Sequence, residues 1–269
     1  MFNFESEVLD VNEKGLFCLI LGSSGAGKSH LIGTVPGKTL YLYCASERHG
    51  VASAKKSNDN IVAVCIDRDA KGQPLKPDES IKRLFAALDP ESIKAAKFES
   101  IALDGLTELE KIIRGTTPWK NACLTPQGKH NNFAEPAATV EAMDKVLSQL
   151  RVVHDILGVR VLVTGIIDVT SVEDNGAILE AKPRLSGYSV AESVCQTFGD
   201  IVMVGRMKGK NGEGPVLQMA GEIGRESKGA DGAIKKTFGF TPRLMGVKKV
   251  PEYIKADFKE VLKLKESNT

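Results

Sequence analysis

The sequence predicts an α/β fold in which a mostly parallel central sheet carries helices on both faces. Two observations lead to this prediction. Short apolar runs bounded by turn residues recur along most of the chain, as is typical of buried parallel strands; they cover residues 15–21, 39–44, 61–66, 100–103, 160–167 and 201–204. Helical patterns lie between these runs, and strands that alternate with helices form a parallel sheet covered on both sides.

The longest helical pattern covers residues 134–157. Its apolar residues recur three or four positions apart and make one stripe, which indicates a helix packed on the sheet: Val140, Met143, Leu147, Leu150, Val153 and Leu157. A shorter pattern predicts a helix at 106–113. A short amphipathic helix near the C-terminus is marked by Tyr253, Ile254, Phe258, Val261 and Leu262.

Length and charge predict one domain with a basic end. A chain of 269 residues, 42% of them hydrophobic, can bury a sizeable core. We expect residues 1–206 to form this core and residues 207–269 to form a basic extension packed on it, within one compact domain. Residues 205–265 contain 14 Lys and Arg against 7 Asp and Glu, whereas the remaining chain contains 22 against 27. A solvated lysine-rich face explains this asymmetry, and so does a polyanionic partner.

The chain shows no sign of a membrane or of an oxidising compartment. It lacks a run of about 20 apolar residues, and its N-terminus lacks the basic-then-apolar pattern of a signal peptide. We therefore expect a cytoplasmic protein without a membrane partner. Because the cysteines show no CxxC spacing, reduced core thiols are expected at Cys18, Cys44, Cys65, Cys123 and Cys195.

Residues 22–29, GSSGAGKS, satisfy the pattern G-x-x-x-x-G-K-[ST] of a phosphate-binding loop (P-loop), between a predicted strand and a predicted helix. The glycines let the backbone wrap closely enough for its N–H groups to point at phosphates. Lys28 would reach the β- and γ-phosphates, and Ser29 would ligate Mg²⁺. ATP and Mg²⁺ are therefore expected at Gly22, Ser23, Ser24, Gly25, Ala26, Gly27, Lys28 and Ser29. The alternative is a glycine-rich turn with an exposed lysine.

A second magnesium-associated acid is expected at Asp104. This residue ends the apolar run 100–103, and ligands of open parallel sheets bind at the carboxyl ends of the strands. Asp104 would hold the Mg²⁺ shell together with Ser29. The alternative is an N-cap of the helix at 106–113.

Hydrolysis of ATP requires a group that orients the attacking water. Glu47 lies just past the strand 39–44, which we expect beside the P-loop strand, so Glu47 is the predicted catalytic glutamate. Its alternative is a surface residue in a turn. Thr164, inside the strand 160–167, is predicted to sense the γ-phosphate, and its alternative is a core threonine.

The order of these parts resembles the RecA-type recombinase core, and more narrowly the short phage-encoded ATPases of single-strand annealing and recombination. The resemblance rests on GSSGAGKS, YLYCASERHG and SIALDGL, then on a polar loop, the helix 134–157, the strand RVLVTGII, a second polar loop and GYSVAESVCQTFGDIVMVGRM. It covers the order of elements over residues 16–207, and only the P-loop is a specific sequence match. It implies a RecA-like P-loop NTPase core in a host cytoplasm.

The resemblance also implies that the polar loops at 115–133 and 168–185 bind single-stranded DNA. Residues suited to base stacking or phosphate contact are Trp119, Lys120, Lys129, His130, Lys182 and Arg184. The second loop also carries Glu173, Asp174 and Glu180, which argue against a strong phosphate clamp. The alternative is a pair of mobile surface insertions.

The family completes its site with a basic residue from the next subunit, a place that Arg225 or Lys228 could fill. The resemblance thus implies a homo-oligomer, either a ring or a filament, and a single-strand DNA-binding protein as a further partner. Two departures stand out. Gly165, Ile166 and Ile167 replace the polar residue expected near the end of the sensor strand, and a long N-terminal extension is missing.

The first functional hypothesis is an ATPase that acts on single-stranded DNA. A DNA motor or packaging ATPase shares the P-loop and Asp104 but normally carries a nuclease or helicase module. A nucleotide-gated binding protein would hydrolyse ATP slowly. A small-molecule kinase is least favoured, because its lid needs several arginines and the arginines here are scattered.

Overall fold

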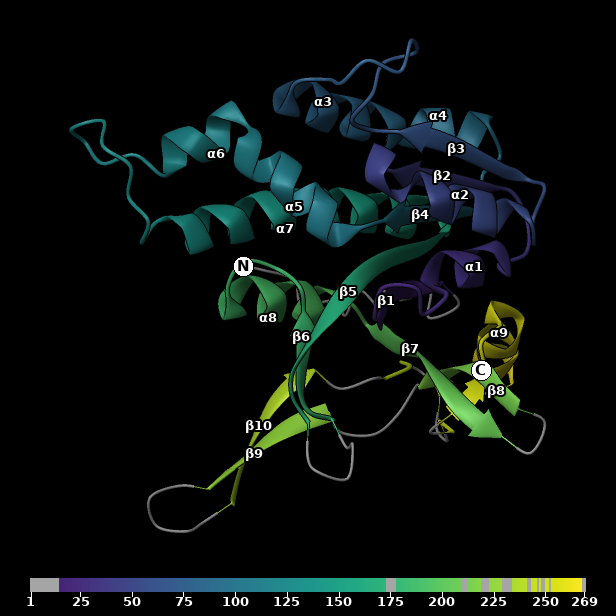
Figure 1. Ribbon diagram of the computed structural model, residues 1–269. Coiled ribbons are helices and arrows are strands. Elements are labelled where there is room, and N and C mark those ends of the chain that lie inside the picture. The colour runs from purple at the N-terminus through teal and green to yellow at the C-terminus, as the bar shows by residue number, and fades with distance from the viewer. Residues whose placement is uncertain are drawn as a thin grey trace, which may run out of the picture.

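The computed structural model describes residues 15–172, 178–209, 212–218, 223–228, 234–240, 243–245, 247, 250–251 and 253–267. Nine strands of this part of the chain form one sheet. Six are parallel, in the order β7-β1-β5-β4-β2-β3, which confirms the predicted α/β class (Figure 1). They are β7 (Asp200–Gly209), β1 (Phe17–Gly22), β5 (Arg160–Val172), β4 (Ser100–Asp104), β2 (Thr39–Tyr43) and β3 (Ile61–Cys65).

Helices cover both faces of this sheet, because alternate strand residues point to opposite sides. Leu19 and Leu21 of β1 belong to one hydrophobic core, whereas Cys18 and Ile20 belong to the other. The first face is covered by α3 (Pro77–Ala87), α4 (Pro90–Ala95), α5 (Leu106–Gly115), α7 (Glu135–Leu157) and α8 (Tyr188–Thr197). The second face is covered by α1 (Lys28–Gly33), α2 (Arg48–Lys55) and α9 (Phe258–Glu266).

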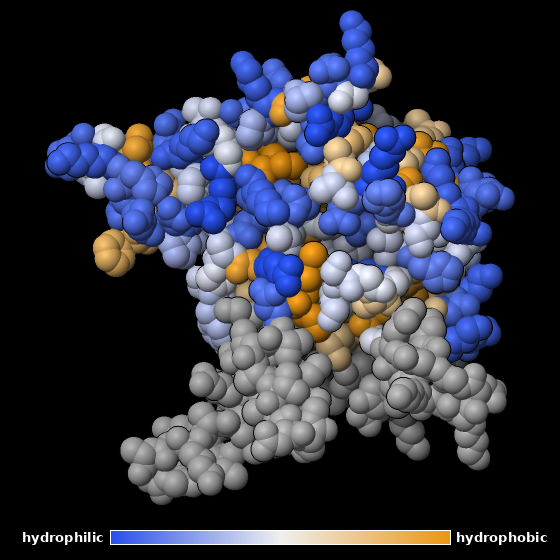
Figure 2. Space-filling model, in the orientation of Figure 1, coloured by the Kyte–Doolittle hydropathy of each residue, from blue (hydrophilic) through white to orange (hydrophobic). Residues whose placement is uncertain are grey.

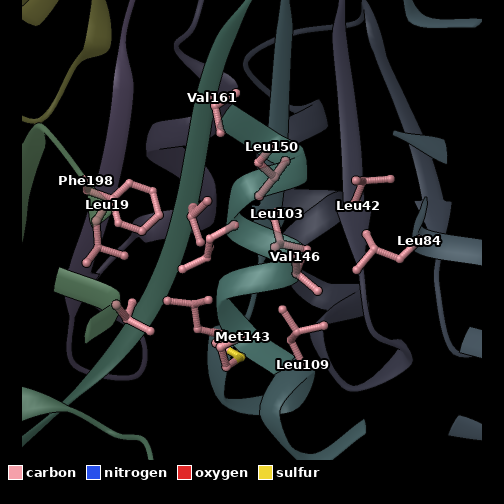
Figure 3. Close-up of a cluster of buried hydrophobic side chains, with 14 of the residues drawn as sticks. Leu19, Leu42, Leu84, Leu103, Leu109, Met143, Val146, Leu150, Val161 and Phe198 are labelled. Carbon is pink, nitrogen blue, oxygen red and sulfur yellow. The ribbon is translucent and has the colours of Figure 1, made fainter. Parts of the chain in front are cut away.

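Helix α7 is the central support of the first core. Met143, Val146 and Leu150 of α7 face Leu103 of β4 and Val161 of β5 in Figure 3. The predicted stripe is confirmed, since Met143, Leu147, Leu150 and Val153 are fully buried, and Val140 and Leu157 pack against the same cluster. Gly158 ends the helix with φ 65°, a left-handed conformation that favours glycine.

The C-terminal extension continues the core sheet. Strand β8 (Gly212–Gln218) pairs antiparallel with β7, and β11 (Tyr253–Lys255) pairs with β8. The expected boundary at 206/207 therefore falls inside β7. The expected C-terminal helix starts later than its apolar pattern indicates, because Tyr253 and Ile254 pair with β8 and Asp257 caps α9 by accepting from the Lys259 N–H.

The two polar segments expected as loops contain regular structure, which corrects that expectation. Residues 115–133 include α6 (Thr117–Ala122), which Thr116 caps and Pro118 opens. Residues 168–185 complete a hairpin, because β5 continues to Val172 and β6 (Ile178–Pro183) pairs with it antiparallel. The β-branched residues Val169, Thr170 and Val172 favour the strand. Beyond this hairpin, β9 (Ile223–Lys228) and β10 (Ile234–Phe240) form a separate antiparallel pair.

The cysteines and the helices of the described chain can be compared with what the sequence predicts. All five cysteines are free, and four of them are buried, the exception being Cys65. In the part of the chain that the structure covers, every helix is too short or too polar to cross a bilayer. Figure 2 shows a mainly hydrophilic face with small hydrophobic areas where side chains are described.

A buried ion pair fastens α9 to the start of β7. Lys265 Nζ lies 2.7 Å from Asp200 Oδ2, and the two side chains are only 9% and 3% exposed. Asp200 Oδ1 also accepts the Met245 N–H at 2.9 Å. The charge of Asp200 is therefore balanced by a lysine that comes from the far end of the sequence.

We expect Lys265→Met to lower the free energy of unfolding by about 3–5 kcal/mol, because it leaves the Asp200 carboxylate buried without its cation. Urea unfolding followed by circular dichroism measures the loss. Lys263→Met is the matched control on the same helix, since Lys263 is exposed and pairs with Glu260 at the surface. A loss from Lys265→Met no larger than that of the control would contradict this role.

Candidate functional site

The loop between β1 and α1 forms an open cradle of backbone. Gly25 and Gly27 have φ of 75° and 102°, in the left-handed region, and no atom lies within 4 Å of a Cβ built at either position. Helix α1 begins at Lys28. Its first N–H groups have no carbonyl partner within the helix. At the other end of the loop, a Cβ at Gly22 would lie 2.8 Å from the Val204 carbonyl of β7. The loop is therefore packed tightly at its base and open at its tip.

Lys28 braces this loop from inside. Its Nζ donates to the carbonyl oxygens of Gly22 and Ser23, each at 2.9 Å. Burial lowers the pKa of Lys28, while the carboxylates of Asp104 and Glu47 act in the opposite direction. The ammonium therefore sits between the loop carbonyls and two acids.

Asp104 ends β4 as a buried carboxylate that is 3% exposed. It accepts hydrogen bonds from three hydroxyl groups on three elements: Ser29 Oγ at 2.9 Å, Thr164 Oγ1 at 2.5 Å, and the Tyr41 phenol. The predicted meeting of Ser29 and Asp104 is confirmed. The N-cap alternative is wrong, because Gly105 occupies that position before α5.

Thr164 holds Asp104 and the start of α5 in place. Besides donating to Asp104, its hydroxyl accepts the Gly105 N–H at 2.9 Å. The side chain is buried, as the core alternative expects, and it also lines the cavity described below. Contact with a γ-phosphate stays a prediction.

Tyr41 is a site residue that sequence reasoning missed. It occupies a fully buried position of β2, where the apolar run 39–44 reads as core, yet its hydroxyl bonds to Asp104 Oδ2. Burial and the neighbouring Asp104 carboxylate raise the pKa of Tyr41, so the phenol keeps its proton and donates it. The available signal was the hydroxyl itself, since a buried tyrosine hydroxyl needs a partner.

Glu47 lies in a short 3₁₀ turn, η1 (Ala45–Glu47), that follows β2. Its expected position beside the P-loop strand is wrong, because β5 and β4 separate β1 from β2. Glu47 nevertheless shares a cavity with Lys28 and Asp104, so it is not a plain surface residue. Burial raises the pKa of Glu47, and the charges of Asp104 and Glu108 raise it further.

Lys28, Ser29, Glu47, Asp104 and Thr164 line one cavity of about 240 Å³, which lies at the carboxyl ends of β1 and β4 and beside the middle of β5. Its wall includes five residues that the sequence did not single out for it: His30, Gly50, Ser53, Gly105 and Ile166. A Cβ at Gly50 would lie 2.6 Å from Ser29 Oγ and 2.7 Å from Asp104 Oδ2. Any larger residue at this position of α2 would therefore have to displace the Ser29–Asp104 pair.

The structure corrects the prediction that Trp119 stacks on bases. Trp119 is 7% exposed, its Nε1 donates to Thr139 Oγ1 at 2.9 Å, and Arg114 covers its ring at 5.2 Å. The residue packs α6 against α7. In the same segment Lys120 and Lys129 are exposed, and His130 Nε2 lies 2.7 Å from Glu135.

The other predicted nucleic-acid and subunit contacts lie on the hairpins. Arg184 is exposed and pairs with Asp168 at 2.5 Å. Lys182 lies in β6, and Arg225 and Lys228 lie in β9 opposite Thr237 and Ile234. The side chains of these three basic residues fall outside the described part of the structure. In Figure 1 the connection between α6 and α7 projects away from β6, so the described parts of the two expected DNA segments lie apart.

We expect Tyr41→Phe to lower the free energy of unfolding by about 1–3 kcal/mol, because the buried Asp104 carboxylate loses one of its three donors. Chemical denaturation gives the value. Tyr43→Phe is the control, since Tyr43 lies two residues along the same strand and is partly exposed. Equal stability of the two variants would show that the phenol does not support the carboxylate.

Two comparisons with known proteins found no similar sequence. No protein-family model matches the chain, and no curated protein matches it. The features of this chain that bear on function are therefore the loop of residues 22–29, the amine of Lys28 and the acid that Ser29 contacts.

Proposed function

We propose that this chain is a RecA-like P-loop ATPase that binds Mg-ATP in the cavity beside residues 22–29 and acts on single-stranded DNA in recombination or annealing. The observation that carries the proposal is the hydrogen bond between Ser29 and Asp104 beside the amine of Lys28. Residues that are 75 positions apart in sequence thus form the pair that a P-loop requires.

The cradle fits a chain of phosphates. Its glycines leave the tip of the loop free of side chains, so backbone N–H groups can approach phosphate oxygens. The ammonium of Lys28 already points into the loop, where it can exchange the carbonyls of Gly22 and Ser23 for β- and γ-phosphate oxygens.

The donor set beside it fits magnesium. Mg²⁺ prefers hard oxygen ligands and usually retains several waters. The Ser29 hydroxyl would be a direct ligand, and the Asp104 carboxylate would accept hydrogen bonds from the water shell. Tyr41 donates to the same carboxylate oxygen of Asp104 as Ser29 does, and Thr164 donates to the other oxygen. A bound Mg²⁺ would neutralise charge that develops on the phosphates.

Glu47 is the residue placed to orient the attacking water. It lies in the same cavity as Lys28 but is bonded to neither Ser29 nor Asp104 among the described contacts. A raised pKa suits a base that accepts a proton from water near neutral pH.

Binding of single-stranded DNA is supported by the segment between α6 and α7. Lys129 is exposed there and Lys120 is exposed on the neighbouring α6. Phe133 is 97% exposed, so a stacking aromatic remains although Trp119 is buried. The basic extension adds positive charge on the C-terminal side. A homo-oligomer would let Arg225 or Lys228 reach a neighbour's nucleotide, and a single-strand DNA-binding protein is a compatible partner.

We expect Lys28→Ala to weaken Mg-ATP binding at least about 100-fold and to abolish turnover, because no other lysine or arginine lines the described cavity. Titration with a fluorescent ATP analogue and a phosphate-release assay measure the two effects. Lys111→Ala is the control, since Lys111 is exposed on α5. Turnover is measured with and without single-stranded DNA. Wild-type protein that fails to bind Mg-ATP would refute the ATPase proposal, and turnover unchanged at saturating DNA would refute the DNA role.

We expect Glu47→Gln to retain Mg-ATP binding but to lower turnover about 10²–10⁴-fold. Because only ionised Glu47 can accept a proton, wild-type turnover should fall as the pH drops through its raised pKa, at a higher pH than for an ordinary glutamate. The control, Glu108→Gln, removes a charge that raises this pKa, so it should move the acid limb to lower pH. A pH profile of turnover that is the same in all three proteins would exclude Glu47 as the base.

A further inference from the structure

The backbone of Arg184 is fixed beside the cavity. Its N–H donates to the Ile166 carbonyl at 2.7 Å, and its carbonyl accepts the Thr107 hydroxyl at 2.9 Å. Ile166 lines the cavity, and Thr107 lies in the first turn of α5, three residues after Asp104. The segment that follows β6 is thus held against two elements that build the site.

The next residues strengthen this attachment. Glu110 of α5 is 5% exposed and accepts the Ser186 N–H on both of its oxygens, at 2.9 and 3.1 Å, as well as the Ser186 hydroxyl. A buried carboxylate with three such contacts resists displacement. The chain on the α8 side of Arg184 is therefore held against α5, whereas the Arg184 side chain is 54% exposed.

The guanidinium of Arg184 has a weak and replaceable partner. Its Nε donates to Asp168 Oδ1 at 2.5 Å, and the two side chains are 54% and 35% exposed. Exposed ion pairs of this kind contribute little to stability. The positive charge of Arg184 also acts on Lys28 in the loop of residues 22–29. Burial lowers the pKa of Lys28 most, and the charge of Arg184 lowers it further.

The cavity needs a further cation if it holds a triphosphate. Lys28 is the only lysine or arginine among the described residues that line it, whereas Glu47 and Asp104 bring negative charge. Mg²⁺ and one lysine leave part of the triphosphate charge uncompensated. A guanidinium is suited to the gap, because its planar donors match phosphate oxygens in pairs.

We propose that Arg184 leaves Asp168 when ATP binds and contacts the γ-phosphate within the same subunit, which makes it a catalytic residue and couples the nucleotide to the β5–β6 hairpin. The inference rests on the proposed ATPase function. It assigns to this chain a cation in cis, in addition to the basic residue expected from a neighbouring subunit. Asp168 pairs with Lys182 at the base of the hairpin. When Arg184 leaves Asp168, the change in charge would therefore act first on this end of the hairpin.

The test compares Arg184→Ala, Arg184→Lys and Asp168→Asn. We expect Arg184→Ala to weaken binding of a non-hydrolysable ATP analogue about 10–100-fold, to leave ADP binding unchanged, and to lower turnover about 10²–10³-fold. Arg184→Lys should restore part of both losses. Asp168→Asn releases the guanidinium, so the ratio of ATP-analogue to ADP affinity should rise. Thermal unfolding without nucleotide verifies that all three variants fold.

Opposite signs for the two members of the ion pair are the decisive result. If Arg184→Ala and Asp168→Asn weaken both nucleotides to the same extent, the pair is structural and the inference is overturned. If wild-type protein binds and hydrolyses Mg-ATP but Arg184→Ala matches it, only the role of Arg184 fails. If wild-type protein shows no Mg-dependent nucleotide binding, this inference and the proposed function fail together.

Discussion

The site depends on the burial of one negative charge, the carboxylate of Asp104, at the end of β4. An ionised carboxylate removed from water is costly unless hydrogen bonds replace its hydration. Here three hydroxyl groups do so, and they come from α1, β2 and β5. The arrangement ties the glycine-rich loop to three strands through a single side chain.

Strand register brings these groups together. Asp104 is paired with Thr164 on one side and with Tyr43 on the other, so its neighbours are set by the ladder of β4 with β5 and β2. Tyr41, two residues before Tyr43, shares its face of the strand and reaches the same carboxylate. A one-residue slip of either strand would turn these side chains to the opposite face of the sheet and break the site.

Local patterns predicted the framework well. The apolar runs and the stripe of α7 could be found because burial on a sheet imposes a period that a sequence displays. The pairing of Ser29 with Asp104 followed from the rule that ligands gather at the carboxyl ends of parallel strands. Tyr41 escaped notice because a buried tyrosine at an alternating position is indistinguishable from core until its hydroxyl partner is known. Gly50 escaped because close contact between α2 and the loop is a property of tertiary packing.

Two of the errors share a physical source, which is that polar stretches were equated with absence of structure. Trp119 lies in such a stretch but packs α6 on α7, and the hairpin of β5 and β6 forms where acidic and basic residues suggested a loop. The strand order was also open, since connections along the chain do not reveal that β5 and β4 lie between β1 and β2.

The bonds from Lys28 to the carbonyls of Gly22 and Ser23 have a consequence for how a ligand enters. Because the amine already bonds to both carbonyls, the loop is ordered there before the proposed phosphate ligand binds. Binding would then replace the carbonyl acceptors of Lys28 by phosphate oxygens and would not have to order a flexible loop. A preorganised binding site loses less conformational entropy when a ligand binds.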